Sequence, residues 1–189
     1  DALNGLGDTW LFETISHKFH ACCHGLHATL EAFRPMQGRH AEIAAISVST
    51  NPRWLRVCNI PTPRDGLECK FSYRHVLAMA ALGQDTASID AYTEASANDG
   101  VLKAFREKVS VSGDDTFSET AIRLSVELQN GEAHELFHDL DAPIVFADRK
   151  ARILAKSASL IGQDNADELQ QLVFTQADPD TLGTFLLNK

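Results

Sequence analysis

The sequence predicts an α+β fold in which a mostly antiparallel sheet packs against helices. Apolar residues alternate strictly from Ile122 to Leu128 and are followed by Asn130-Gly131, the turn pair typical of a β-hairpin. Helical patterns flank this hairpin on both sides and do not alternate with single strands, as they would in a parallel sheet. The 189 residues, of which 44% are hydrophobic, are enough to bury one sizeable core.

The chain before residue 60 is expected to form three strands and one helix. Residues 10–19 are rich in Trp, Phe, Thr and Ile, which favours a strand. Residues 24–33 carry apolar side chains at helical spacing and are closed by Pro35. Residues 40–49 and 53–58 are predicted to be two strands joined across Thr50-Asn51-Pro52, which is turn chemistry.

Two helices and three strands are expected between residues 72 and 140. A helix is predicted from Ser72, a plausible N-cap, to Gly83, a typical stop, and another over 101–108. Val109-Ser110-Val111 begins a strand. Residues 134–140 are the expected return strand of the hairpin.

The end of the chain is predicted to be helical. Residues 151–160, 166–174 and 178–187 carry helical patterns with apolar faces. We therefore expect an α+β domain over residues 1–147 and a helical segment over 148–189.

The amino-acid composition indicates which kinds of partner the protein binds and in which cellular compartment we expect it. A net charge of -9 and a pI near 5.3 disfavour nucleic acid and an anionic membrane surface. No apolar run approaches the ~18 residues that span a bilayer. The four cysteines do not suggest a disulfide scaffold, so we expect reduced thiols and a cytoplasmic protein.

Two polar clusters could carry chemistry. The denser one contains Lys18, His20, Cys22, Cys23, His24 and His27, and the second contains Lys70, Ser72, Arg74 and His75. Each precedes or begins a predicted helix, where unpaired backbone N–H groups favour anions, so together they suggest a polycarboxylate site. The alternative is that these residues are ordinary surface charges and packed side chains.

Other chemistries are weighed for the same residues. The histidines and cysteines of the first cluster are competent zinc ligands, but no second ligand pair accompanies them. A nucleophilic Cys22 or Cys23 is an alternative to an inert thiol. His134-Glu135-Leu136-Phe137-His138 matches HExxH, yet on a strand its histidines would stand roughly 13 Å apart. No phosphate-binding glycine motif occurs.

Three stretches together resemble the MmgE/PrpD family. Residues 6–10 (LGDTW) and 16–23 (SHKFHACC), with His27, are similar to the family's LG..W, followed by a lysine, an aromatic or proline pair, one or two cysteines and a histidine. Residues 63–72 (PRDGLECKFS) resemble its P...GLEAKFS signature, the most specific of the three. Residues 126–131, with Pro143 downstream, resemble its late strand and turn.

The resemblance covers nearly the whole chain but only the later part of the family's usual chain, which begins with a large all-helical domain. It implies a lyase or isomerase that acts on citrate-like di- and tricarboxylates without metal or organic cofactor, in a cleft between two domains. Known activities are 2-methylcitrate dehydration, cis-aconitate decarboxylation and iminodisuccinate epimerisation. The implied partners are a small polycarboxylate, the all-helical domain and, as in many members, a second copy in a homodimer.

The resemblance also assigns roles. Lys18 matches the family's active-site lysine and would clamp a substrate carboxylate. Cys23 stands where cis-aconitate decarboxylases carry a histidine, and His75 where many members have a tyrosine, and both departures count against a decarboxylase. The catalytic candidates are Lys18, Cys23 and His75, and the substrate-binding candidates are His20, His24, His27, Lys70, Ser72 and Arg74.

The other acid and base groups of the family lie on the all-helical domain. The resemblance therefore implies that this chain supplies half of the cleft and is inactive by itself. The alternative function is a non-catalytic ligand-binding or regulatory module that retains the fold without the helical domain.

Overall fold

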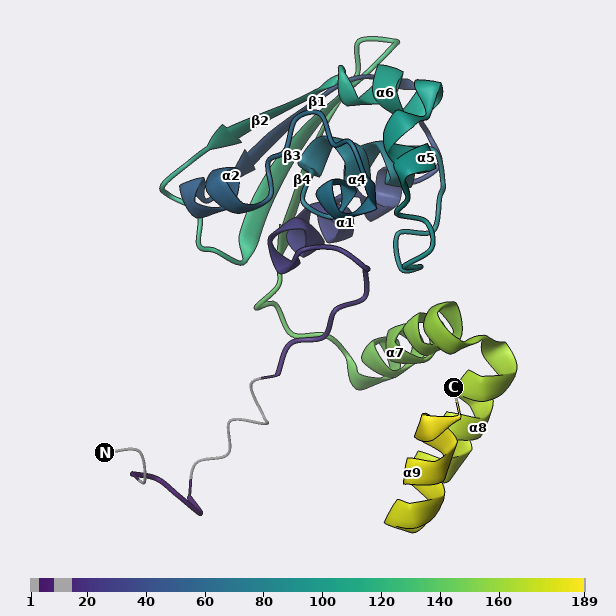
Figure 1. Cartoon of the computed structure of the whole chain (residues 1–189). Helices are drawn as coiled ribbons and strands as arrows, with labels where there is room; N and C mark the ends of the chain where they lie inside the picture. Colours follow the sequence, from purple (N-terminus) through teal and green to yellow (C-terminus); the bar gives the residue numbers. More distant parts are fainter. Residues whose placement is uncertain (1–3, 9–14, 189) are drawn as a thin grey trace.

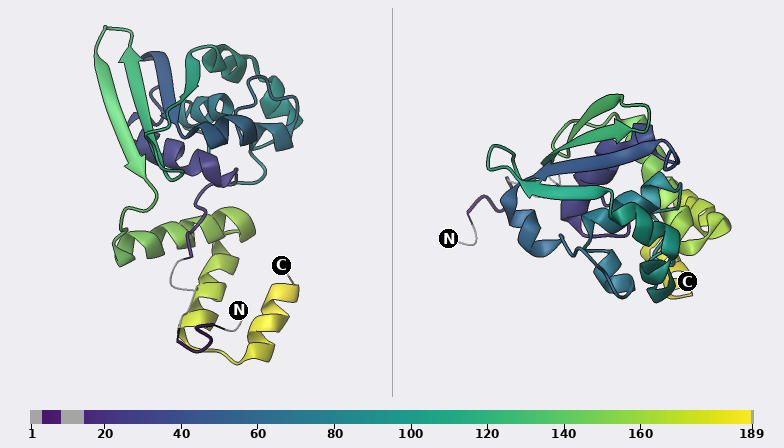
Figure 2. Two further views of the ribbon diagram at one scale, coloured as in Figure 1. Left: turned by 90° about the vertical axis from the view of Figure 1, so that its left-hand side faces the viewer. Right: turned by 90° about the horizontal axis from the view of Figure 1, so that it is seen from above.

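The computed structural model describes residues 4–8 and 15–188 and shows a four-stranded sheet with helices on one face (Figures 1 and 2). The strand order is β2-β1-β3-β4. The strands are β1 (Ile43–Thr50), β2 (Val109–Gly113), β3 (Ala121–Leu128) and β4 (Ala133–Asp139). The α+β fold class predicted from the sequence is confirmed.

The helices fall into a group on the sheet and a group at the C-terminus. The first group is η2 (His24–Leu26), α1 (His27–Phe33), η3 (Arg34–Met36), α2 (Pro52–Val57), α3 (Gly66–Cys69), α4 (Tyr73–Ala81), α5 (Glu94–Asn98) and α6 (Gly100–Arg106). The second is α7 (Phe146–Ile161), α8 (Gln163–Phe174) and α9 (Pro179–Leu187), which lies to one side of the sheet (Figure 1). No helix in the described ranges is both long and apolar enough to cross a membrane.

The core lies between one face of the sheet and helices α1 and α4. α1 packs on β3 and β4, and α4 packs on β2, α1 and α6. Every residue of α1 is buried, as are eight of the nine residues of α4. The opposite face of the sheet exposes Ser47, Arg123 and Glu127. This arrangement holds α1 rigidly, so the polar residues just before it are fixed in place.

The hairpin predicted at Asn130-Gly131 is present. β3 and β4 pair antiparallel with Val126 opposite His134, and Gly131 adopts a positive φ of 85°. β1 pairs antiparallel with β3. β1 also pairs with β2, but this pairing is parallel, with Ile46 opposite Val109, which the expectation of antiparallel pairings did not include. A crossover through α2–α6 makes the parallel pair possible.

Two predicted strands need correction. Residues 53–58 were expected to be a strand, but Pro52–Val57 form α2. The Asn51 side chain accepts a hydrogen bond from the Arg53 N–H at 3.0 Å and Pro52 occupies the first turn, and this capping starts a helix. Of the strand expected over 10–19, residues 15–19 are irregular and 10–14 lie outside the described residues.

The three C-terminal helices are confirmed, although α7 and α8 begin several residues before the predicted starts at 151 and 166. The division into domains at residue 147 stays a prediction. α7 begins at Phe146 and is bonded to the sheet-containing body, since Lys156 Nζ donates to the Ala87 carbonyl and Ser159 Oγ donates to Asp85 at 3.1 Å.

Candidate functional site

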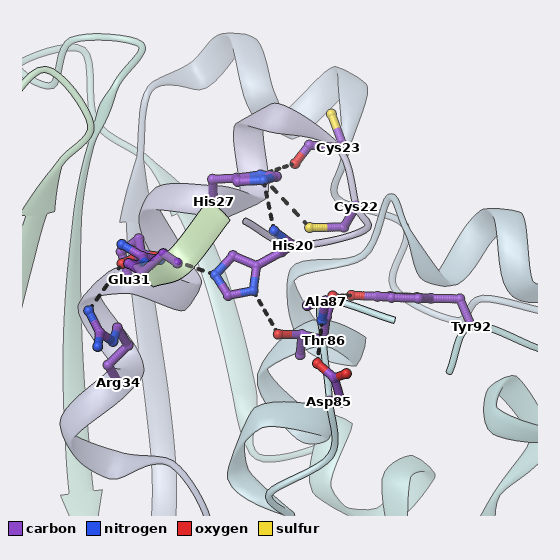
Figure 3. Close-up of polar contacts among 11 residues, drawn as sticks. His20, Cys22, Cys23, His27, Glu31, Arg34, Asp85, Thr86, Ala87 and Tyr92 are labelled. Carbon is purple, nitrogen blue, oxygen red and sulfur yellow. Dashed lines mark hydrogen bonds and ion pairs between the residues drawn. The ribbon is translucent and has the colours of Figure 1, made fainter. Parts of the chain in front are cut away.

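The predicted cluster around residues 18–27 forms one compact loop before α1, and Figure 3 shows its centre. The His27 ring lies 3.1 Å from the Cys23 carbonyl oxygen through Nδ1 and 3.4 Å from the His20 backbone nitrogen through Nε2. A carbonyl can only accept and a backbone N–H can only donate, so Nδ1 carries the proton. Burial, aided by the neighbouring His20, lowers the pKa of His27 to about 3. His27 is therefore a neutral ring that holds the loop in shape.

His20 is also engaged through both ring nitrogens. Nδ1 lies 2.7 Å from Thr86 Oγ1, in the loop after α4, and Nε2 lies 3.0 Å from Glu31 Oε1, on α1 (Figure 3). With Nε2 donating to the carboxylate, Nδ1 accepts from the threonine hydroxyl. His20 thus joins two elements that are distant in sequence.

Glu31 is a buried carboxylate at the junction of the body and α7. Its side chain is 4% exposed and accepts from His20 Nε2 and from Arg152 Nη2 of α7, with Arg34 Nη1 3.8 Å away. Burial alone would raise the pKa of Glu31, but the hydrogen bonds from His20 and Arg152 lower it to about 2. Glu31 is therefore ionised at neutral pH and its charge is compensated.

The two adjacent cysteines differ in protonation. A hydrogen bond from Cys58, against partial burial, lowers the pKa of the half-buried Cys23 to about 6. Burial raises the pKa of Cys22 to about 12. At neutral pH Cys23 is a thiolate and Cys22 a thiol. The exposed Lys18 donates from Nζ to the Cys22 carbonyl oxygen at 3.4 Å and its charge helps to lower the pKa of Cys23.

A cavity of about 240 Å³ lies beside this loop, between α1, the end of β4 and the first turns of α7. Its polar lining includes Ser16, His17, His24, His27, Glu31, His138, Asp141, Arg149 and Arg152. His24 and His138 are half-buried, and within the described residues neither ring makes a hydrogen bond. Desolvation lowers the pKa of both. The cavity therefore presents free nitrogen groups to any ligand that enters.

The second predicted cluster is dispersed. Ser72 is fully buried and its Oγ accepts from the His75 N–H at 3.2 Å as the N-cap of α4. Arg74 Nε donates to the Val109 carbonyl at 2.9 Å. The Lys70 carbonyl accepts from the Cys23 N–H at 2.9 Å, so among these residues Lys70 is the one placed next to the first cluster.

His75 lies inside the protein. Its ring is fully buried, with Nδ1 3.4 Å from Arg106 Nη1 and Nε2 3.5 Å from Ser96 Oγ. Burial first, and then the Arg106 charge, lower its pKa to about 4. His75 is thus neutral and belongs to the packing between α4, α5 and α6.

The HExxH match lies on β4, as predicted from the hairpin pattern, because His134 and His138 are both in that strand. No group of three or more metal-ligating side chains in the described part of the chain is arranged to hold a metal ion.

Three residues of the site were missed at the level of sequence, namely Glu31, Arg149 and Arg152, and His138 was noted only as part of the HExxH match. Glu31 left a signal, since it is the one acidic residue in the apolar run HATLEAF. The two arginines left none, because they are ordinary cations on the polar face of an amphipathic helix.

Comparison with known proteins gives one finding. The family model described as the MmgE/PrpD C-terminal domain matches residues 20–172, which include the sheet, the cluster before α1 from His20 onward, and Arg149 and Arg152 of α7, but not Lys18. No curated protein matches the chain.

Proposed function

This chain belongs to the MmgE/PrpD family, a family of dehydratase-like enzymes, and we propose that it supplies half of the active-site cleft of a cofactor-free lyase or isomerase acting on citrate-like di- and tricarboxylates. The observation that carries the proposal is the cavity beside residues 18–27. Histidines and arginines dominate its polar lining although the chain has a net charge of -9. The guanidinium of Arg149 and the N–H groups of the neutral imidazoles are hydrogen-bond donors, which favours an anionic ligand rich in acceptors.

The chemistry follows from the charges of the loop. Lys18 binds a substrate carboxylate and offsets its charge, which makes the adjacent C–H more acidic. The Cys23 thiolate, with its pKa of about 6, is suited to accept that proton near neutral pH. His20 and His27 keep the loop rigid through ring nitrogens that are already bonded.

His75 is the weakest of the three catalytic candidates. Its ring is fully buried against Ser96 and Arg106, so substrate contact would require α5 to move. The proposal therefore rests on Lys18 and Cys23, and on His24, whose ring lines the cavity and makes no hydrogen bond within the described residues.

The C-terminal helices are proposed to pack against the all-helical domain that completes the cleft. Phe146 of α7 is 73% exposed and Phe174 of α8 is 58% exposed. Both line an apolar groove of about 270 Å³ between these two helices. Exposed apolar surface of this kind marks an interface, and self-association into a homodimer through it is the competing outcome.

Histidine and amide NMR shifts during titration with citrate, 2-methylcitrate and cis-aconitate test the proposal. Saturable shifts at residues 18–27 should be lost in Lys18→Ala. The matched control is Lys103→Ala on α6, where the lysine Nζ donates to Asn98 Oδ1 and lies away from the cavity. Equal behaviour of the two variants, or no shifts in the parent, would refute the proposal.

A further inference from the structure

Arg149 carries a half-buried guanidinium that has no partner among the described residues. It lies in the first turns of α7 and lines the cavity of about 240 Å³. Within the described residues its side chain makes no hydrogen bond and no ion pair. Arg152, three residues further along the same helix, is in contrast bonded to Glu31 and lies over the Phe19 ring at 3.7 Å. The five N–H donors of Arg149 therefore remain available to a ligand.

Two imidazoles line the same cavity. His24 belongs to η2 and His138 to β4, so free donors from three separate elements converge on one space. Neither ring makes a hydrogen bond in the described part of the chain. Three free nitrogen groups held by separate elements form a ready-made set of donors for an acceptor-rich ligand.

Both acidic residues of the cavity lining already have partners in the described part of the chain. Glu31 is compensated by Arg152, His20 and Arg34. Asp141 is the other acidic residue of the lining, and its Oδ2 accepts from Thr120 Oγ1 at 3.2 Å. Of the two arginines of the lining, Arg152 is paired with Glu31, and Arg149 has no ion pair within the described residues.

We propose that Arg149, with His24 and His138, forms a second carboxylate-binding subsite that determines specificity for di- and tricarboxylates. The inference rests on the proposed function and deepens it, since it adds to Lys18 a second anchor, which belongs to α7. A planar guanidinium holds a carboxylate through two parallel hydrogen bonds. A ligand with two or more carboxylates can engage both anchors, whereas a monocarboxylate can engage one.

Isothermal titration calorimetry with citrate and acetate on the full chain tests the inference. Arg149→Gln should weaken citrate binding by about tenfold, as expected for the loss of a charge-assisted contact. The control is Lys150→Gln, which removes a neighbouring charge that lies over the Phe174 ring at 4.4 Å, outside this cavity. Citrate should bind the control as it binds the parent, and acetate should bind much more weakly than citrate.

The outcomes distinguish failure of the Arg149 subsite from failure of the proposed function. If Lys18→Ala weakens citrate binding and Arg149→Gln does not, the proposed function stands and the subsite is overturned. If Arg149→Gln weakens binding and Lys18→Ala does not, the subsite stands and Lys18 is not an anchor. Equal weakening by Arg149→Gln and Lys150→Gln would show an effect of net charge alone and overturn the subsite. No saturable binding by about 10 mM citrate would overturn both.

Discussion

Arg152 of α7 donates a hydrogen bond to the buried carboxylate of Glu31 in α1, a residue 121 positions earlier in the chain. This bond fixes the first C-terminal helix against the body and makes α7 one wall of the polar cavity. It also compensates the charge of Glu31, so that this carboxylate repels an anionic ligand less. A single long-range pair thus contributes both to stability and to the charge of the site.

Removing the charge of Glu31 should loosen α7. Glu31→Gln leaves Arg152 without its anionic partner, and we expect the free energy of unfolding to fall by about 2–4 kcal/mol. Hydrogen exchange in α7 should speed up more than exchange in β3. Urea denaturation and exchange mass spectrometry measure both effects. The control Glu42→Gln breaks the exposed pair with Arg39 and should leave stability unchanged, so similar losses in the two variants would contradict the role assigned to Glu31.

Stability should fall as the pH drops below about 6.5. The pKa values of His27 and His75 are lowered from 6.5 to about 3 and about 4, so between these values the unfolded chain binds protons that the folded chain does not. Each ring contributes a slope of about 1.4 kcal/mol per pH unit. In His27→Asn, the free energy of unfolding should therefore depend less steeply on pH, by the contribution of one histidine. Urea denaturation from pH 7.5 to 4.5 measures this dependence. A pH-independent free energy over this range would contradict the neutral, buried rings.

Acid should also act through Glu31, in a lower window. Because its pKa is lowered from 4.5 to about 2, its stabilising effect is complete above 4.5 and is lost as the pH falls toward 2. The drop in stability between pH 4.5 and 3 should therefore be smaller in Glu31→Gln than in the parent. Thermal melts across this window compare the two, and identical pH profiles would show that folding does not lower the pKa of Glu31.

Cys23 should be the reactive thiol. Its alkylation by iodoacetamide is expected to reach half of its maximal rate near pH 6, while the buried Cys22, Cys58 and Cys69 stay protected. Cys58→Ala removes the hydrogen bond that lowers the pKa of Cys23, so the midpoint should move toward 9. Cys69→Ala serves as the control and should not move it. Peptide mass spectrometry follows the alkylation of Cys23. A midpoint near pH 9 in the parent would rule out a Cys23 thiolate at neutral pH.

Gly66, in the GLECKFS stretch, is required by close packing. A Cβ at this position would collide with the Tyr92 carbonyl oxygen, so Gly66→Ala should destabilise the fold by about 1–3 kcal/mol. Gly100 begins α6 with no atom within 4 Å of the equivalent Cβ, and Gly100→Ala should be neutral or slightly stabilising. Urea denaturation distinguishes the two, and equal effects would contradict this explanation.

The local parts of the fold were predictable from sequence because their signals are local. Alternation in β3, the Asn130-Gly131 turn and the helical spacing in α4 each act over a few residues. The strand expected over 53–58 failed because the cap formed by Asn51 and Pro52 outweighed the content of Trp, Leu and Val. The parallel pairing of β1 with β2 joins segments about sixty residues apart, and no short pattern encodes it.

The candidate site likewise contains residues that local sequence predicts and residues that only the tertiary fold brings to it. Residues 18–27 come together because they are neighbours in sequence, and their gathering before α1 could be predicted. Arg149 and His138 reach the cavity only through the placement of α7 and β4. Arg74 and His75 were grouped with Lys70 by sequence, yet the helical turns after Ser72 direct them to β2 and to α6.

The central claim is that this cavity binds a polycarboxylate, and a crystal structure of the chain with citrate tests it most directly. We predict one citrate carboxylate within about 3 Å of the Arg149 guanidinium, with His24 or His138 bonded to the same ligand. A second carboxylate should lie toward Lys18. Citrate bound elsewhere on the surface, or a cavity without ligand at a citrate concentration that saturates binding in solution, would contradict the account.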